Sequence, residues 1–171
     1  MIVYGHIIYT ILCVIIKSIF LCNITYNMFN YIITELDKSD YHNGFLQLLE
    51  QLTTVNANEI SYSDFCNHLD KLKSKVFVIN NEKCKVIGTA SIFIEEKFIH
   101  ELSSVGHIED VVVDSEYRGK GLGTMLINHC IKYANDNSCY KVLLNCAEKN
   151  IEFYKKCGFD CKNVEMSLYL H

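Results

Sequence analysis

Residues 105–124 read VGHIEDVVVDSEYRGKGLGT, and this stretch decides the fold. Its first part, Val105–Val113, is a strongly β-prone run that belongs in the middle of a sheet, yet it carries Glu109 and Asp110 at its centre. A buried carboxylate costs free energy unless it is paired or hydrogen-bonded, so a strand that keeps two of them indicates a functional site. Adjacent strand residues point to opposite faces, so only a bulge would let both carboxylates face one cleft. The alternative interpretation is an edge strand with one solvated face.

The second part, Asp114–Thr124, is a glycine-rich turn that leads into an amphipathic helix over 122–137. Strand, turn and helix N-terminus together form an anion cradle, because glycines let the backbone approach a ligand and unpaired N–H groups point at its charge. Arg118 and Lys120 add positive charge. Neither the Walker A pattern nor the dinucleotide fingerprint is matched, since Thr124 stands where that fingerprint has its third glycine. The turn therefore indicates a phosphate or pyrophosphate site of another kind, with a plain structural loop as the alternative.

The rest of the chain alternates between strand and helix patterns. The predicted elements are strands over 31–35, 75–80, 85–95 and 141–146 and helices over 41–52, 61–74 and 150–157. Ser61 is expected to cap the second helix, and Gly158 to close the last one, with Phe159 following it into the core. This order predicts an α/β domain built on a central sheet.

Composition limits the classes of function. The chain has 171 residues, enough for one domain, is half hydrophobic and carries a formal net charge of −4. This balance excludes the broad basic face that binding of nucleic acid through its phosphates requires. Arg118, on the glycine-rich turn, is the only arginine among the 16 basic residues.

The nine cysteines do not form a recognisable framework. Their number is odd, no C-x-x-C pair occurs, and no Cys/His group has zinc-ligand spacing. We interpret them as reduced thiols in a cytoplasmic domain, and most of them, such as Cys66 and Cys130, as small core residues.

The first 27 residues differ from the rest. Met1–Cys22 is an apolar run without an acidic residue, broken by Lys17. Its length suits a membrane anchor, whereas translation from Met28 would leave it out of the working protein. We therefore expect a hydrophobic extension over 1–27, through which alone a membrane could be bound, and one domain over 28–171.

Several separate segments agree in order and spacing with one known superfamily. The acidic strand, the R-G-K-G-L-G turn and the N-x-x-x-Y-x-x-x-G-F pattern at 150–159 resemble the GCN5-related N-acetyltransferase (GNAT) superfamily. Within it, the stretches FIEEKFIHELSSVGHIEDVVV (93–113), CYKVLLNC (139–146) and AEKNIEFYKKCGF (147–159) are similar to glucosamine 6-phosphate N-acetyltransferases. The likeness covers residues 29–168, nearly the whole domain.

The resemblance implies a fold and a co-substrate. It implies the GNAT fold, a central mixed, mostly antiparallel sheet flanked by helices and splayed between the strands at 105–113 and 141–146. Acetyl-CoA would enter at the splay, with its pyrophosphate on the turn and its pantetheine arm along 111–113, and no metal is implied. The implied cofactor-binding residues are Val111, Val112, Val113, Arg118, Gly119, Lys120, Gly121, Leu122, Gly123, Thr124, Asn145, Asn150 and Tyr154.

The resemblance also implies a reaction. In this family the acetyl group passes from acetyl-CoA directly to the amino group of glucosamine 6-phosphate in a ternary complex, on the route to UDP-N-acetylglucosamine. Tyr154 matches the tyrosine that stabilises the departing thiolate, and Glu109 and Asp110 match positions that hold the amino sugar and accept or relay its proton. The implied substrate-binding residues are Thr53, Lys97, His100, Glu109, Asp110, Tyr140 and Lys141. Considered alone, Lys97 and His100 suit a phosphomonoester or a solvated surface pair.

Two positions depart from the family pattern, both on the acceptor side. Asn145 stands where the family usually has Asp and cannot accept a proton, and Tyr169 stands where the family ends its last strand with Arg. The family is homodimeric and shares its acceptor sites between subunits, so a homodimer is expected. Two other functions stay open: a GNAT enzyme acting on a polyamine or a protein N-terminus, and a CoA-binding module without chemistry, which would not need Tyr154 beside an acidic strand.

Overall fold

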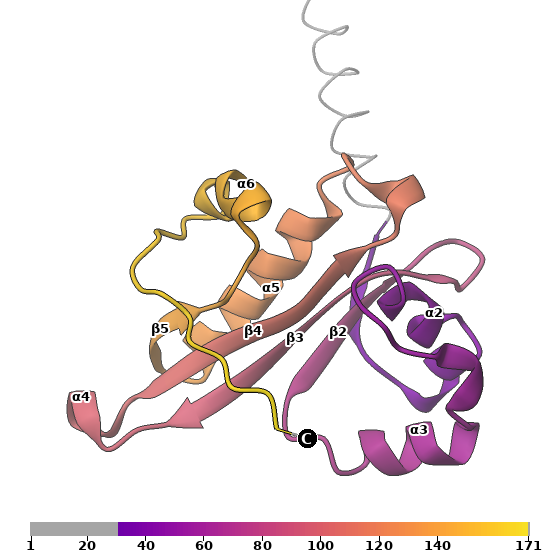
Figure 1. The fold of residues 1–171 in the computed structure, drawn as a ribbon, viewed down its shortest axis with the longest axis horizontal. Coiled ribbons are helices and arrows are strands. Elements are labelled where there is room, and N and C mark those ends of the chain that lie inside the picture. The colour runs from indigo at the N-terminus through magenta and orange to yellow at the C-terminus, as the bar shows by residue number, and fades with distance from the viewer. Residues whose placement is uncertain (1–30, 171) are drawn as a thin grey trace, which may run out of the picture. The chain divides into compact units, whose positions relative to one another are not determined.

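The computed structural model describes residues 31–170 (Figure 1), so the apolar extension over 1–27 and the alternative start at Met28 lie outside the described residues. The strands are β1 (Ile33–Glu35), β2 (Lys75–Asn80), β3 (Val86–Glu96), β4 (Ser104–Val113) and β5 (Cys139–Leu143). The helices are α2 (Phe45–Leu49), α3 (Tyr62–Leu69), α4 (Ile99–Leu102), α5 (Leu122–Asp136) and α6 (Ile151–Lys156), with short 3-10 helices η1 (Lys38–Tyr41), η2 (Ala57–Glu59), η3 (Ser115–Tyr117) and η4 (Glu148–Asn150). Within 31–170, no helix has the length and hydrophobicity of a membrane span.

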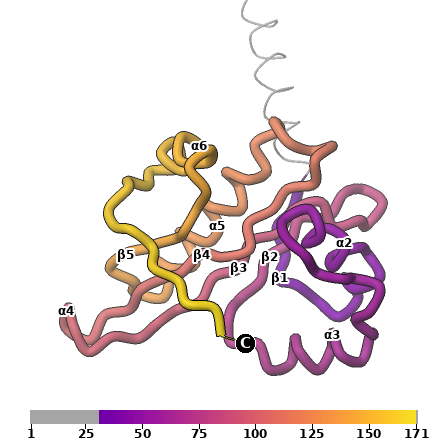
Figure 2. Tube along the Cα trace, viewed as in Figure 1, coloured from indigo at the N-terminus to yellow at the C-terminus, as the bar shows by residue number. Residues whose placement is uncertain are grey.

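The five strands form one mixed sheet in the order β1-β2-β3-β4-β5 (Figure 2). The first four strands pair antiparallel, and β5 runs parallel to β4. A parallel neighbour needs a crossover, and α5 supplies it between β4 and β5. The prediction of a central mixed, mostly antiparallel sheet is confirmed.

Helices cover both faces of the sheet. On one face, α2 and α3 place Leu48 and Phe65 in a buried cluster with Val78 and Val112 of the strands. On the other face, α5 approaches so closely that a Cβ at Gly88 would lie 3.2 Å from the side chain of Leu126. Each face of the sheet therefore buries an apolar layer, which holds β4 rigidly between them.

The helix predicted over 41–52 is wrong at both ends, because α2 spans only Phe45–Leu49. Gly44 has φ 85°, in the left-handed region, and acts as the N-cap of α2, so the chain divides into η1 and a shorter α2. The helix predicted over 61–74 ends at Leu69. Its predicted cap is confirmed, because the Ser61 hydroxyl accepts a hydrogen bond from the backbone N–H of Asp64 at 3.1 Å.

Three predictions near the C-terminus need correction. The strand expected over 141–146 lies at 139–143, so Asn145 comes after its end. Phe159 is half-buried and does not enter the core. No strand follows β5 among the described residues, and Tyr169, expected on a last strand, is 86% exposed.

The cysteines are less buried than expected. All seven that the structure describes are free thiols, and among these seven only Cys130 is buried, on α5, where burial raises the pKa of its thiol to about 12. Cys84, Cys146 and Cys161 are exposed. The prediction that most cysteines are core residues is therefore wrong for this part of the chain.

Candidate active site

A pocket of about 860 Å³ opens beside the C-terminal half of β4, within the range of about 300–1,000 Å³ that is usual for small-molecule sites. The sequence-predicted residues that line it are Glu109, Asp110, Val111, Val112, Val113, Arg118, Gly119, Gly121, Leu122, Gly123, Thr124, Asn145, Asn150 and Tyr154. Lys120 does not line it; its Nζ lies 4.4 Å from the centre of the Tyr117 ring. One cavity therefore gathers all the predicted cofactor-binding residues apart from Lys120.

The pocket exists because β4 and β5 separate. The two strands pair from Ser104–Cys139 to His107–Leu143, whereas β4 continues to Val113. Beyond His107, the edge of β4 that faces away from β3 has no strand partner among the described residues. The expected splay is therefore present, and its open backbone N–H and C=O groups can pair with an amide-bearing ligand.

A bulge in β4 turns both carboxylates toward this pocket. The register places Glu109 opposite Ser91 and Val112 opposite Thr89, so β4 has one residue more than β3 between these pairs. Asp110 has φ 51°, in the left-handed region that Asp enters more readily than most residues. In consequence Glu109 and Asp110 both line the pocket, which a regular strand would not allow.

Burial raises the pKa of two acid–base groups in the pocket. Burial, followed by the charge of Asp110, raises the pKa of the Glu109 carboxyl above its ordinary value. Burial is also the main cause that raises the pKa of the Tyr154 phenol, with smaller contributions from neighbours such as Cys146. The pocket therefore holds a carboxyl group whose basicity burial increases and a phenol whose protonated form burial favours.

Aromatic packing fixes Tyr154 on α6. Its ring meets those of Phe153 and Phe159 edge-on, with centroids 4.9 Å and 6.2 Å away. Phe153 in turn lies against the start of α5, where a Cβ at Gly123 would come within 3.1 Å of its ring. The last glycine of the glycine-rich turn therefore also makes room for α6, the helix that carries the Tyr154 phenol.

The turn has the features of an anion site. Gly119 and Gly121 have φ 78° and 81°, and no atom lies within 4 Å of where their Cβ atoms would be. The N-terminus of the 15-residue helix α5 follows directly, with its free backbone N–H groups. Arg118 Nε donates to the carbonyl of Val113 at 3.0 Å, which holds the guanidinium beside the end of β4. The residues present therefore fit a pyrophosphate.

The Arg118→Ala variant is expected to bind acetyl-CoA about tenfold or more weakly, because a charge-assisted hydrogen bond to a phosphate is lost. Its kcat at saturating acetyl-CoA should change little. Calorimetric titration with CoA measures the affinity. Arg118→Lys, which keeps the charge and loses the bond to Val113, should fall between the two proteins, and an unaltered CoA affinity in Arg118→Ala would show that the cradle is misplaced.

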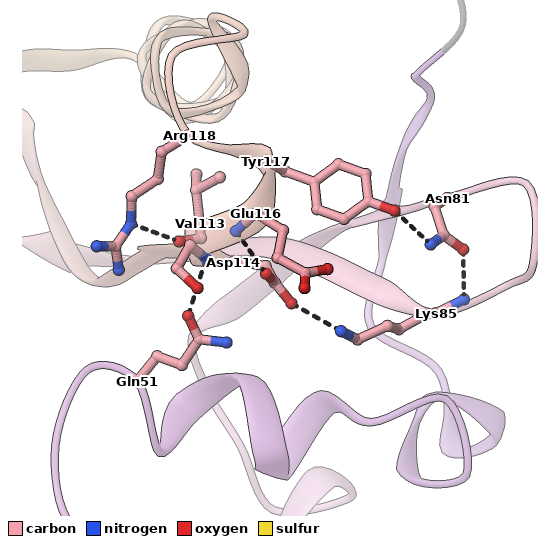
Figure 3. Close-up of polar contacts among 9 residues, drawn as sticks. Gln51, Asn81, Lys85, Val113, Asp114, Glu116, Tyr117 and Arg118 are labelled. Carbon is pink, nitrogen blue, oxygen red and sulfur yellow. Dashed lines mark hydrogen bonds and ion pairs between the residues drawn. The ribbon is translucent and has the colours of Figure 1, made fainter.

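An ion pair between a buried carboxylate and a half-exposed lysine supports the start of the turn (Figure 3). Asp114 is 2% exposed, accepts from Lys85 Nζ at 2.8 Å and caps η3 through the backbone N–H of Glu116 at 3.0 Å. Asn81 Nδ2 donates to the hydroxyl of Tyr117 at 3.0 Å. The β2–β3 hairpin turn therefore holds the start of the glycine-rich turn at two points.

Lys85→Met is expected to lower the free energy of unfolding by about 1–3 kcal/mol near neutral pH, because the buried Asp114 carboxylate loses its partner. The hydrogen bond from Lys85 is the main cause that holds the pKa of Asp114 below its ordinary value. The stabilisation is therefore complete above the unfolded-state pKa of about 3.9 and is lost as pH falls through the lowered folded value. Urea unfolding at neutral and acidic pH measures it. Lys83→Met, in the same hairpin turn, is the control, and equal stability of the two variants at neutral pH would contradict the expectation.

The expected phosphate-binding residues lie outside the pocket. His100 on α4, at the tip of the β3–β4 hairpin, has its ring centre 4.1 Å from that of Tyr140, and Lys141 Nζ lies 5.5 Å from the same ring (Figure 1). Lys97 forms an ion pair with Glu95. We call Lys97, His100, Tyr140 and Lys141 the hairpin-tip group, because Tyr140 of β5 lies beside His100; none of the four lines the pocket that holds Glu109. Thr53 is exposed and directly follows Leu52, which lines the pocket.

Sequence reasoning missed several lining residues. Gln51, Tyr117, Cys146, Lys149 and Phe153 also line the pocket. Apart from Gln51, which lies two residues before Thr53, each adjoins a predicted residue, so proximity in sequence was the available signal. In the part of the chain that the structure describes, no group of three or more His, Cys, Asp or Glu residues could hold a metal ion.

Comparisons with known proteins agree with this geometry. Residues 40–159 match the Acetyltransferase (GNAT) family. The glucosamine 6-phosphate N-acetyltransferase of Candida albicans is 43% identical over 141 residues, which cover 80% of this chain and 93% of that protein. The enzyme of the same name from Arabidopsis thaliana is 38% identical over 80% of this chain and 95% of its own length. The crystal structure of the Arabidopsis enzyme superposes with a TM-score of 0.79 at 36% identity, over 82% of this chain and 99% of that one. The chain therefore belongs to the acetyltransferase (GNAT) family.

Proposed function

We propose that this chain transfers the acetyl group of acetyl-CoA to the amino group of D-glucosamine 6-phosphate, as a step toward UDP-N-acetylglucosamine. The observation that carries the proposal is the convergence in one pocket of an anion-binding turn, an open strand edge, an acidic pair and a buried phenol. The names of the relatives from Candida albicans and Arabidopsis thaliana point to the same acceptor. We further propose that residues 28–171 suffice for the activity.

The residues of the turn and of the open edge of β4 bind acetyl-CoA and orient its thioester. Arg118 and the first N–H groups of α5 hold the pyrophosphate, while the open edge at Val111–Val113 pairs with the amides of the pantetheine arm. Asn145 and Asn150 offer amide groups at the opposite wall. This arrangement places the thioester beside Glu109 and Tyr154, which makes transfer effectively unimolecular.

The acceptor amine is activated next to the bulge. Glu109, with Asp110, binds the amino group and takes up its proton, and the amine nitrogen then attacks the thioester carbonyl carbon. Backbone N–H groups at the open edge of β4 stabilise the oxyanion that forms. When the C–S bond breaks, the Tyr154 phenol donates its proton to the sulfur, and the proton that the nitrogen of the adduct then gives up restores the phenol. Asn145 takes no part in proton transfer, because an amide cannot accept the proton.

A homodimer would complete the acceptor site. The hairpin-tip group supplies cations for a sugar phosphate yet lies outside the pocket of its own chain. A second observation supports association: Val164, Met166, Leu168 and Leu170 alternate along the C-terminal segment and are 86–95% exposed. Apolar residues at every second position favour a strand with one buried face, which a second copy of the chain would cover.

Sedimentation velocity tests the dimer. The 19.7 kDa chain is expected to sediment as a dimer, and Leu168→Asp to sediment as a monomer with a raised KM for glucosamine 6-phosphate. Ser167→Asp, which places the same charge on the neighbouring exposed residue, is the control. A monomeric wild-type protein would contradict the shared acceptor site.

Acetyl-CoA consumption tests the reaction itself. Protein starting at Met28 should release CoA rapidly with glucosamine 6-phosphate, slowly with glucosamine and not with a polyamine. Preference for a polyamine would favour the other GNAT enzyme. CoA binding without turnover on any acceptor would favour the binding module.

A further inference from the structure

Two segments that line the pocket are joined by a hydrogen bond of the Gln51 side chain. Gln51 follows α2 and lines the pocket from the side of the 52–55 loop, and Ser115–Arg118 forms the start of the glycine-rich turn. Gln51 Oε1 accepts a hydrogen bond from the backbone N–H of Ser115 at 2.9 Å (Figure 3). Residues 64 positions apart in sequence are thus joined where the loop at 52–55 (the acceptor loop), which bears the implied substrate-binding residue Thr53, meets the glycine-rich turn (the cofactor turn).

On the cofactor side, this N–H needs an outside acceptor. Ser115 is the first residue of η3, where the backbone N–H has no partner within the helix. The neighbouring N–H groups are engaged: that of Asp114 donates to the carbonyl of Ile87 at 2.9 Å, and that of Tyr117 to the carbonyl of Asp114 at 2.8 Å. Gln51 therefore restrains the backbone at Ser115, which these hydrogen bonds do not hold.

On the other side, Gln51 is tied to the loop that bears Thr53. The backbone N–H of Gln51 donates to the carbonyl of Leu48, and those of Leu52 and Thr53 both donate to the carbonyl of Leu49, at 2.9–3.1 Å. These bonds hold the backbone of Gln51 and Thr53 together at the end of α2, while the Gln51 side chain is held by Ser115. A ligand that orders the loop will therefore also order Gln51.

We propose that Gln51 is a positioning residue that couples the acceptor loop to the cofactor turn, so that each substrate strengthens the binding of the other. A ligand on either wall restrains both walls through this hydrogen bond, so the second ligand loses less conformational entropy on binding. The part concerning the acceptor depends on the proposed function. Both partners of the bond are exposed in the free protein, so the bond contributes to ligand binding more than to the stability of the fold.

CoA and glucosamine 6-phosphate together test the coupling, because without an acetyl group no turnover occurs. In the wild-type protein, saturating glucosamine 6-phosphate should tighten CoA binding by about two- to tenfold, the range expected for one hydrogen bond. In Gln51→Ala, CoA alone should bind more weakly by a similar factor, and glucosamine 6-phosphate should no longer change its affinity. The Tm should stay that of the wild type.

Two variants isolate the hydrogen bond. Ser115→Pro removes the donor and leaves Gln51 in place; proline suits the first position of a helix, and Asp114 already has ψ 132°, as a residue before proline requires. It should reproduce Gln51→Ala, and the double variant should lose nothing more. Gln47→Ala, on the exposed side of α2, is the control and should behave as wild type.

The outcomes separate the coupling from the proposed function. Unchanged affinity for CoA alone in Gln51→Ala would overturn the role of Gln51, whatever the acceptor. A wild-type protein that acetylates glucosamine 6-phosphate but shows no mutual effect, or the same effect in Gln51→Ala, would overturn the coupling alone. A wild-type protein that does not acetylate glucosamine 6-phosphate would overturn the proposed function, and the CoA titrations would still decide the role of Gln51.

Discussion

Tyr154→Phe is expected to lower kcat by about 10²–10⁴-fold while the KM for acetyl-CoA stays nearly unchanged. In the proposed mechanism the phenol acts only as negative charge develops on the sulfur, so its loss should affect the transition state and leave the bound substrate unaffected. Burial keeps this phenol protonated, because it raises the pKa of Tyr154. Phenylalanine retains the ring that packs against Phe153 and Phe159, so the fold should be preserved.

Steady-state kinetics with both substrates varied measures this effect. Tyr133→Phe is a matched control. Tyr133 lies on α5, packs against Phe77 of β2 and does not line the pocket. An unchanged kcat in Tyr154→Phe would remove Tyr154 from the mechanism. A raised KM for acetyl-CoA at constant kcat would instead assign it to binding.

Glu109→Gln is expected to lower kcat by about 10²-fold or more, because the amide keeps the shape of the carboxylate but cannot accept the amine proton. In the wild-type protein, kcat/KM should fall as pH drops through the pKa of Glu109, which burial raises above its ordinary value of 4.5. This acid limb should be absent from the residual activity of the variant.

Asp110→Asn gives a sharper test of the same group. Asparagine also adopts the left-handed conformation that residue 110 has in the bulge, so the backbone should be retained. After burial, the charge of Asp110 is the next cause that raises the pKa of Glu109, so its removal should move the acid limb to lower pH. If the acid limb of the kcat/KM profile stays at the same pH in Asp110→Asn, a group other than Glu109 sets that limb.

The strand, turn and helix around residue 113 could be predicted almost to the residue. β4 was expected over 105–113 and lies at 104–113, and α5 was expected over 122–137 and lies at 122–136. Their signals are local: β-branched residues, glycines and a helical period. The cofactor-binding residues within this stretch were implied by the resemblance to the GNAT superfamily; of these, Lys120 does not line the pocket, and Tyr117, which does, was missed.

Features that depend on distant residues could not be predicted in the same way. The bulge follows from pairing with Thr89 and Ser91, and no glycine marks it in the strand. Without it, one could not tell whether Glu109 and Asp110 share a cleft. Likewise, the place of the Gln51 side chain depends on its hydrogen bond with Ser115, 64 residues further along the chain. The position of the hairpin-tip group depends on the length of the β3–β4 hairpin.

The open edge of β4 has a consequence for how the protein behaves between catalytic cycles. An unpaired edge inside a sheet exchanges its amide hydrogens with water and can pair with another extended chain. In the proposed binding mode the pantetheine arm lies along Val111–Val113, where it would act as a missing strand and protect those amides. Deuterium uptake there should therefore report cofactor occupancy directly, and protein stored with CoA should resist aggregation better than protein stored without it.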